Sequence, residues 1–94
     1  MRVRWLDSAI DSLDAQGEYI ARNDPEAAAR IVSSILSSVE RLATFPASGR
    51  PGRIPGTREL IVPGTPFIIP YRIRAGTVEI LRVLHASRKW PGRS

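Results

Sequence analysis

One stretch decides the fold of this chain. It runs from Thr57 to Trp90 and reads TRELIVPGTPFIIPYRIRAGTVEILRVLHASRKW. Three runs within it are rich in β-branched and aromatic residues, with short breaks of turn-forming residues between them: Glu59–Val62, Pro66–Ile73 and Thr77–Leu84. A parallel return between strands needs a dozen or more connecting residues, so runs this close together can pair only as an antiparallel meander.

A two-residue turn at positions 75–76 predicts the pairing within this meander. It places Ile73 opposite Val78 and Phe67 opposite Leu84. The core face predicted from this register comprises Phe67, Ile69, Tyr71, Ile73, Val78, Ile80 and Leu84. Alanine is a poor residue for the positive φ of such a turn, so a longer loop with a shifted register is the alternative.

The opposite face of the predicted sheet carries charge. Arg72 and Glu79 form a predicted cross-strand pair there. Pro70 lies in the same strand as Arg72, and because proline cannot donate to a sheet ladder it indicates an edge or a bulge. Arg82 falls on the apolar face in this register. It either finds a carboxylate partner at the end of the sheet or shows that the register is wrong.

Two helices, over residues 8–22 and 25–44, are predicted to precede the meander. The second has the clearer pattern, with apolar residues three and four positions apart on one face: Ala28, Ile31, Val32, Ile35, Val39 and Leu42. Asp24 is the predicted N-cap of the second helix, and Asp7 or Ser8 that of the first.

The alternation of apolar and basic residues over Arg2–Leu6 predicts one further strand. Each helix has one apolar face, and a meander needs one of its faces covered. We therefore predict an α+β fold, with an N-terminal strand, a two-helix antiparallel hairpin and a three-stranded antiparallel meander. The predicted sheet is four-stranded and mainly antiparallel, with both helices on one face. A chain of 94 residues has room for one such domain, over residues 1–94.

Composition excludes several classes of function. The chain has no cysteine and one histidine, which argues against disulfides, iron–sulfur clusters and zinc sites, so we expect no metal and no cofactor. The first residues, MRVRWLDS, do not have the pattern of a signal peptide. No apolar run approaches the roughly 20 residues of a membrane span, so we expect a cytoplasmic protein that does not bind membranes.

The charge is unevenly distributed along the chain. Residues 46–94 hold eight arginines and one lysine against two glutamates, a net charge of +7, whereas residues 1–45 have a net charge of −2. A basic half indicates an acidic or polyanionic partner. Codon usage and solubility are the alternative explanation. The loop over residues 47–56 contains Arg50 and Arg53, which either contact phosphates or are solvated loop charges.

These residues carry a resemblance to a known family. The segments PEAAARIVSSILSSVERLATFPASGRPGR, PGTRELIVPGTPFIIPYRI and VEILRVLHASRKWP, in the order helix, helix and three strands, resemble the RelE/ParE superfamily of type II toxin–antitoxin toxins. The resemblance covers nearly the whole chain and is closest to the ParE-like branch. It implies a small cytoplasmic bacterial toxin with no small-molecule substrate, neutralised by a cognate, ParD-like antitoxin whose tail wraps its surface.

Two branches of this superfamily imply different activities. The RelE-like branch resembles a ribosome-dependent mRNA endonuclease, in which basic side chains stabilise the phosphate transition state. When the RelE-like pattern is aligned to this chain without gaps, its three strand cations fall at Glu59, Ile61 and Ile68. Its terminal tyrosine falls near Ser94. Only its C-terminal arginine is kept, as Arg88. The ParE-like branch lacks this set and is described as inhibiting DNA gyrase by binding it. The resemblance therefore favours a non-enzymatic gyrase inhibitor.

The alternative is a ribosome-dependent ribonuclease acting on ribosome-bound mRNA, with His85 as general base and Arg88 as phosphate ligand. A strand-end histidine that bonds to the backbone is the structural alternative for His85. Trp90 is either a binding hot spot or packs over the sheet edge. The predicted target-binding residues are Arg82, His85, Arg88, Lys89 and Trp90, with activity in the C-terminal segment. The predicted antitoxin-binding residues are Arg50, Arg53, Arg58, Arg72 and Arg74.

Overall fold

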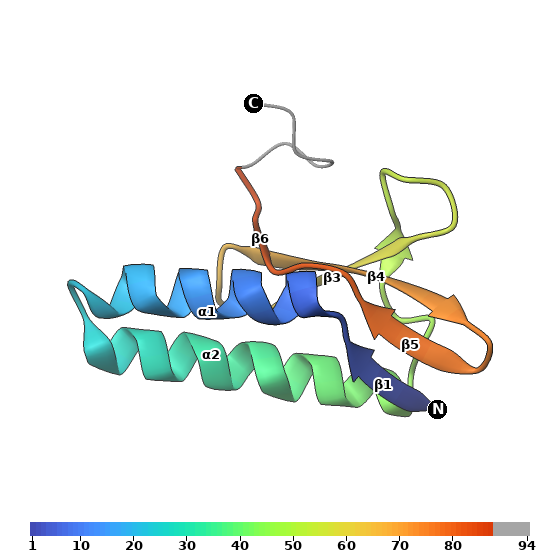
Figure 1. Cartoon of the computed structure of the whole chain (residues 1–94), viewed down its shortest axis with the longest axis horizontal. Helices are drawn as coiled ribbons and strands as arrows, with labels where there is room; N and C mark the ends of the chain where they lie inside the picture. Colours follow the sequence, from blue (N-terminus) through green and yellow to red (C-terminus); the bar gives the residue numbers. More distant parts are fainter. Residues whose placement is uncertain (88–94) are drawn as a thin grey trace.

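Two helices and a mixed sheet make up the fold (Figure 1). The computed structural model describes residues 1–87. In chain order the elements are β1 (Arg2–Trp5), α1 (Asp7–Ala21), α2 (Pro25–Glu40), the 3₁₀ helix η1 (Arg41–Ala43), β2 (Arg50–Pro51), β3 (Arg58–Ile61), β4 (Phe67–Arg74), β5 (Thr77–Ile80) and β6 (Leu84–His85). Among residues 1–87, no helix is long and apolar enough to cross a membrane.

The strands form one sheet in the order β1-β5-β4-β3-β2, and β6 pairs with β4 as well. The antiparallel meander of β3, β4 and β5 is confirmed, and so is the helix hairpin, whose two helices lie side by side against one face of the sheet (Figure 1). β1 pairs in parallel with β5, with Val3 opposite Val78. The predicted count of four strands was too low, because β2 forms inside the predicted loop of residues 47–56 and β6 is separated from β5.

The two-residue turn between β4 and β5 is confirmed. Ala75 has φ +50° and Gly76 has φ +73°, and Ile73 lies opposite Val78 as predicted. Alanine in the left-handed region is unfavourable by about 1–2 kcal/mol, a strain that the paired strands on either side maintain. The turn also ends the sheet here, which leaves Ile73 41% exposed instead of in the predicted core.

The register changes by one residue beyond Ile80. Ile68 lies opposite Leu84 and Phe67 opposite His85, so the predicted Phe67–Leu84 pair was wrong. Pro70 lies beside this change and lacks the N–H that would continue the ladder. The extra residue turns Val83 into the core, whereas Leu84 is buried outside the core cluster. A bulge, which inserts one residue into a strand, produces this change of face.

The bulge also explains where Arg82 lies. Its side chain is exposed between β5 and β6 and not on the apolar face, so the register predicted beyond Ile80 was wrong. Two serines of α1 satisfy the main chain of the bulge: Ser8 Oγ donates to Leu81 O at 2.9 Å, and Val83 N–H donates to Ser12 Oγ at 2.8 Å. Ser8 therefore binds the sheet and is not a helix cap.

The helix ends differ in how closely they follow prediction. Asp24 caps α2, accepting from Ala27 N–H at 3.0 Å, as predicted. The N-cap of α1 is Leu6, with no side-chain bond, so the predicted cap at Asp7 or Ser8 was wrong. Gly17 faces α2, and a Cβ there would lie 3.4 Å from Val32 Cγ2, an ordinary van der Waals contact.

The core lies between the helices and the sheet. Ile35 and Val39 of α2 are buried, and Ile31 packs against them, as the helical spacing predicted. The buried cluster comprises Ala9, Ile35, Val39, Leu42, Val62, Phe67, Ile69, Tyr71, Val78, Ile80 and Val83. Tyr71 ties the chain after η1 to the sheet, because its hydroxyl donates to Pro46 O at 2.7 Å and accepts from Gly49 N–H at 2.9 Å.

Candidate functional site

The face of the sheet turned away from the helices carries two buried carboxylates. Glu59 lies opposite Pro70, and Glu79 lies opposite Arg72 two residues further along β4, so both carboxylates share this face. Glu59 is 2% exposed and Glu79 is 5% exposed. Buried carboxylates are found where cations or hydrogen-bond donors satisfy them, and arginines do so here.

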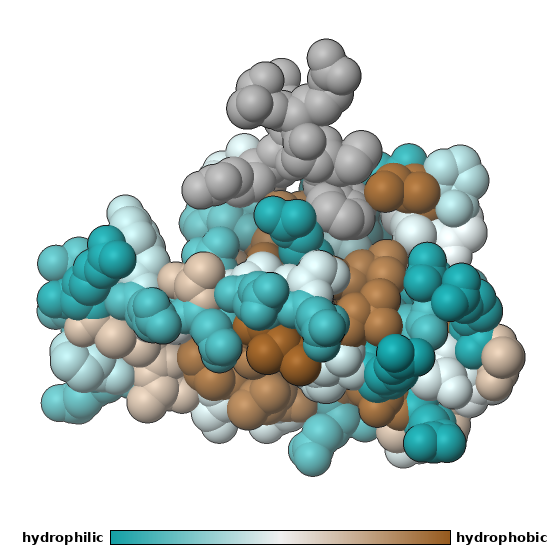
Figure 2. Space-filling view, viewed as in Figure 1, coloured by the Kyte–Doolittle hydropathy of each residue, from teal (hydrophilic) through white to brown (hydrophobic). Residues whose placement is uncertain are grey.

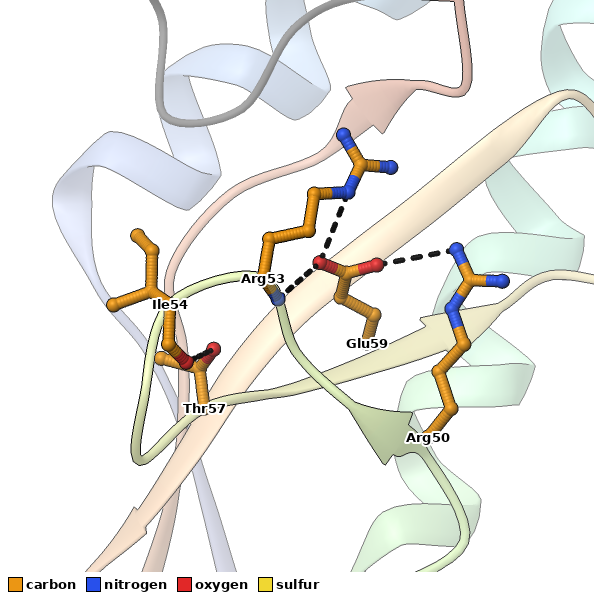
Figure 3. Close-up of polar contacts among 5 residues, drawn as sticks. All are labelled: Arg50, Arg53, Ile54, Thr57 and Glu59. Carbon is orange, nitrogen blue, oxygen red and sulfur yellow. Dashed lines mark hydrogen bonds and ion pairs between the residues drawn. The ribbon is translucent and has the colours of Figure 1, made fainter.

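Glu59 holds the β2–β3 connection in place (Figure 3). Arg50 Nη2 donates to Oε1 at 3.1 Å, and Arg53 approaches Oε2 twice, through its backbone N–H at 3.0 Å and its Nε at 3.3 Å. The turn is closed by Thr57 Oγ1, which donates to Ile54 O at 2.6 Å. Neither arginine is a freely solvated loop charge, since a single carboxylate positions both guanidinium groups.

Glu79 organises a second group of arginines. Arg72 Nε donates to Oε1 at 2.7 Å, Arg74 Nε lies 3.5 Å from the same oxygen, and Arg4 Nη1 lies 3.8 Å from Oε2. The hydrogen bond from Arg72, followed by the charges of Arg74 and Arg4, lowers the pKa of Glu79 below its ordinary value of 4.5, although burial alone would raise it. The predicted Arg72–Glu79 pair is thus present, within a larger cluster.

We call these residues the arginine face: Arg4, Arg50, Arg53, Arg72 and Arg74, arranged around Glu59 and Glu79. Five cations surround two carboxylates, so the surface stays positive. Four of the five arginines predicted to bind antitoxin are brought together here. Arg58 is not, because it shares the face of Tyr71 and donates to Ala47 O at 3.3 Å and to Gly49 O at 2.8 Å.

His85 lies in β6 beside a hollow of about 440 Å³ that also involves Tyr19 and Ser87. Its ring meets that of Phe67 edge-on, with centroids 5.6 Å apart. Ser87 N–H donates to His85 Nδ1 at 3.2 Å. The Ser87 hydroxyl lies 2.8 Å from the same nitrogen. Ser87 therefore positions the His85 ring through Nδ1.

The other predicted target-binding residues are only partly placed. Arg82 is exposed ahead of β6, in the bulge that precedes His85. Arg88, Lys89 and Trp90 lie outside the described residues. The structure therefore brings two of these five positions into one segment of the sheet.

The positions that the resemblance assigns to nuclease cations hold no cation. Glu59 is a buried carboxylate paired with arginines, and Ile68 is buried at 5% exposure. Ile61 is 53% exposed and apolar. Arginines do approach this region of the sheet through Glu59, a feature that the sequence reasoning missed. The sequence did contain a sign of these clusters, because Glu59 and Glu79 are the only acids among residues 46–94 and arginines surround them in the sequence.

Comparison with known proteins agrees with this architecture. Residues 3–90 match the family described as ParE toxin of type II toxin-antitoxin system, parDE. The chain is 54% identical to Y4kP of Sinorhizobium fredii (strain NBRC 101917 / NGR234), over 96% of this chain and 93% of that protein. It is 32% identical to toxin RelE2 of Caulobacter vibrioides (strain ATCC 19089 / CIP 103742 / CB 15), over 93% of this chain and 97% of that protein.

Two solved structures have the same fold. A chain of the chromosomal ParDE toxin–antitoxin system from P. aeruginosa superposes with a TM-score of 0.83 at 31% identity, covering 90% of this chain and 95% of that one. A chain of the RelBE2 toxin–antitoxin complex from Mycobacterium tuberculosis gives a TM-score of 0.65 at 29% identity, covering 89% of this chain and 95% of that one. Sequence, fold and chain length agree, and this protein belongs to the ParE toxin family of type II toxin–antitoxin systems.

Proposed function

We propose that this toxin arrests growth by binding DNA gyrase, that it cleaves no RNA, and that a cognate antitoxin neutralises it through the arginine face. The observation that supports the second part, that the toxin cleaves no RNA, is the position of Glu59. A phosphoryl transition state is stabilised by cations aimed at its oxygens. Where a ribonuclease of this superfamily would place such a cation, this chain has a carboxylate whose two oxygens already bind Arg50 and Arg53.

The arginines around Glu59 do not replace the missing cations. Their guanidinium groups are directed at Glu59, so a phosphate would have to compete with a buried carboxylate that lies 3.1 Å from Arg50 and 3.3 Å from Arg53. A fixed negative charge at this point also repels the phosphate itself. This arrangement argues against catalysis on RNA at Glu59.

His85 gives the ribonuclease alternative little support. A general base needs an unprotonated nitrogen that can reach the substrate hydroxyl. Nδ1 of His85 already accepts a hydrogen bond from the Ser87 backbone and lies 2.8 Å from the Ser87 hydroxyl, so this nitrogen is engaged within the chain. His85 is thus a strand-end histidine bonded to the backbone. We propose that it contacts gyrase together with Arg82, Arg88, Lys89 and Trp90.

Two reactions run side by side test the mechanism. Purified toxin is added to a gyrase supercoiling reaction and to ribosomes translating a defined mRNA. We expect loss of supercoiling and an intact mRNA. Codon-positioned cuts that disappear in the His85→Ala variant would establish the ribonuclease alternative and overturn the proposal.

The arginine face is proposed to bind an acidic segment of the antitoxin. Its two most peripheral contacts are those of Arg74 and Arg4 with Glu79, at 3.5 and 3.8 Å, so their removal should disturb the fold least. The double variant Arg4→Gln with Arg74→Gln should slow association with the antitoxin, and added salt should narrow the difference. Arg22→Gln with Arg30→Gln removes the same charge from two exposed positions, the C-cap of α1 and the middle of α2, and is the matched control. Equal slowing by both double variants would contradict a specific role for this face.

A further inference from the structure

The outer edge of β3 is only partly covered. β2 pairs with two of its residues, Arg58 and Glu59, and among residues 1–87 no other strand lies beyond them on that side. β3 therefore ends, at Ile61, with an open edge. Open edges of this kind are places where a further strand can pair.

The direction of the main-chain groups at this edge follows from the pairing with β4. Val62 N–H donates to Phe67 O at 3.1 Å, toward β4. Hydrogen-bonding direction alternates along an antiparallel strand, so the N–H and C=O of Ile61 point away from β4. The same alternation makes the main-chain groups of Glu59 point away from β4. This agrees with the residue opposite Glu59, Pro70, which has no N–H to donate to β3. Ile61 thus directs one donor and one acceptor outward.

An apolar hollow of about 690 Å³ lies beside this edge. It is formed between the end of α2 and β3, and its lining includes Arg41, Phe45, Pro46, Leu60, Ile61 and Pro63. Phe45 is 60% exposed and Ile61 is 53% exposed, although both are large apolar side chains. Large apolar side chains exposed together around a hollow are typical of a binding surface. The face seen in Figure 2 has apolar residues gathered in its middle, with hydrophilic residues around them.

The positive charge beside the hollow favours an acidic partner. Arg41 lines the hollow, and Arg50 lies where β2 ends along the same strand edge. A second copy of this chain would bring its own net charge of +5 to these cations, so self-association is disfavoured. An extended segment with an apolar side chain for the hollow and acidic side chains for the arginines fits the edge, the hollow and the charge together.

We infer that a segment of the antitoxin adds to the sheet as a strand along the outer edge of β3 at Ile61, with an apolar side chain seated between Phe45 and Ile61. The inference rests on the antitoxin partnership of the proposed function and deepens it by naming the place and the conformation of binding. Main-chain pairing supplies affinity, and the hollow and Arg41 supply selectivity.

Amide hydrogen exchange tests the main-chain part directly. Two neighbouring amides are compared in the free toxin and in the complex with its cognate antitoxin, co-expressed and purified together. The Val62 amide is bonded to Phe67 O and should be protected in both. The Ile61 amide should exchange roughly tenfold or more slowly in the complex than in the free toxin. An Ile61 amide that exchanges equally fast in both states would overturn the inference.

A matched pair of variants tests the side-chain part. Ile61→Thr and Ile73→Thr make the same change at strand residues of similar exposure, 53% and 41%. Ile61 ends β3, whereas Ile73 lies in β4 beside the turn to β5. Ile61→Thr should weaken antitoxin binding by roughly tenfold or more, and Phe45→Ala should weaken it further, whereas Ile73→Thr should leave it within about twofold. Equal affinities would overturn the inference but leave the antitoxin partnership intact. A wild-type toxin that binds no antitoxin would overturn the partnership itself.

Discussion

Arg72 Nε lies 2.7 Å from Oε1 of Glu79, in a cross-strand pair between β4 and β5. The pair holds the pKa of Glu79 below its ordinary value of 4.5, with Arg74 and Arg4 adding to the effect. A carboxylate whose pKa is lower in the folded state stabilises the fold at pH values above its unfolded pKa. That stabilisation is lost as the pH falls through the folded pKa.

Removal of the Glu79 charge should therefore make the free energy of unfolding depend less on pH in the acidic range. We expect Glu79→Gln to lose stability relative to wild type near neutral pH and to differ less from it at pH values below the pKa of Glu79. Urea unfolding measured across the acidic range checks this. Glu18→Gln, on the exposed side of α1, is the control and should keep the wild-type pH dependence. A Glu79→Gln variant whose free energy of unfolding falls with pH as steeply as that of wild type would contradict the role of Glu79.

Glu59 should matter more as a structural acceptor than as a surface charge. Glu59→Ala removes the acceptor for Arg50 Nη2 and for the Arg53 backbone N–H, and we expect a loss of about 1–3 kcal/mol in the free energy of unfolding. Glu59→Gln keeps an amide oxygen that can accept from the Arg53 backbone, so its loss should be smaller. Chemical denaturation compares the two. Equal losses would show that charge, and not the backbone bond, is what holds the β2–β3 connection.

Two glycines should respond in opposite directions to alanine. A Cβ on Gly49 would lie 2.7 Å from the Tyr71 ring and 3.0 Å from Glu59 O, so Gly49→Ala should destabilise the fold by about 1–3 kcal/mol. At Gly17 in α1 the nearest atom is Val32 Cγ2 at 3.4 Å, an adjustable side chain. Gly17→Ala should stabilise by up to about 1 kcal/mol through helix propensity. Thermal unfolding of both variants gives the comparison, and a shift of the same sign in both would contradict it.

The C-terminal segment is predicted to contact the target and not the antitoxin. Arg88→Ala combined with Lys89→Ala should abolish most gyrase inhibition, since truncation of an interface arginine at a hot spot typically costs more than about 1 kcal/mol. Antitoxin affinity should stay near the wild-type value, which also shows that the variant is folded. Full toxicity in this variant would place the activity elsewhere, with the Arg50–Arg58 segment as the next candidate.

Sequence patterns predicted the fold well wherever side-chain periodicity determines it. The spacing of Ile31, Ile35 and Val39 identified the buried face of α2, and the Ala75-Gly76 turn set the pairing of β4 with β5. Both features depend on neighbours close in sequence. Periodicity is a local property, so it reports the contacts of such neighbours reliably.

The features that the sequence did not predict depend on distant partners. The bulge before Leu84 is stabilised by Ser8 and Ser12, more than 70 positions away, and an inserted residue leaves no trace in the alternation of a strand. The clusters around Glu59 and Glu79 likewise join residues from separate strands and loops. One member, Arg4, comes from β1, whose parallel pairing with β5 no local pattern indicates.

Inhibition of gyrase by binding is tested most directly by the supercoiling activity of purified gyrase. The gyrase is titrated with the toxin alone and, in parallel, with toxin that has first been mixed with the cognate antitoxin. We predict that activity falls as toxin is added, and that one equivalent of antitoxin added beforehand prevents the loss. Supercoiling that stays unchanged at toxin concentrations that arrest translation by mRNA cleavage would contradict the account.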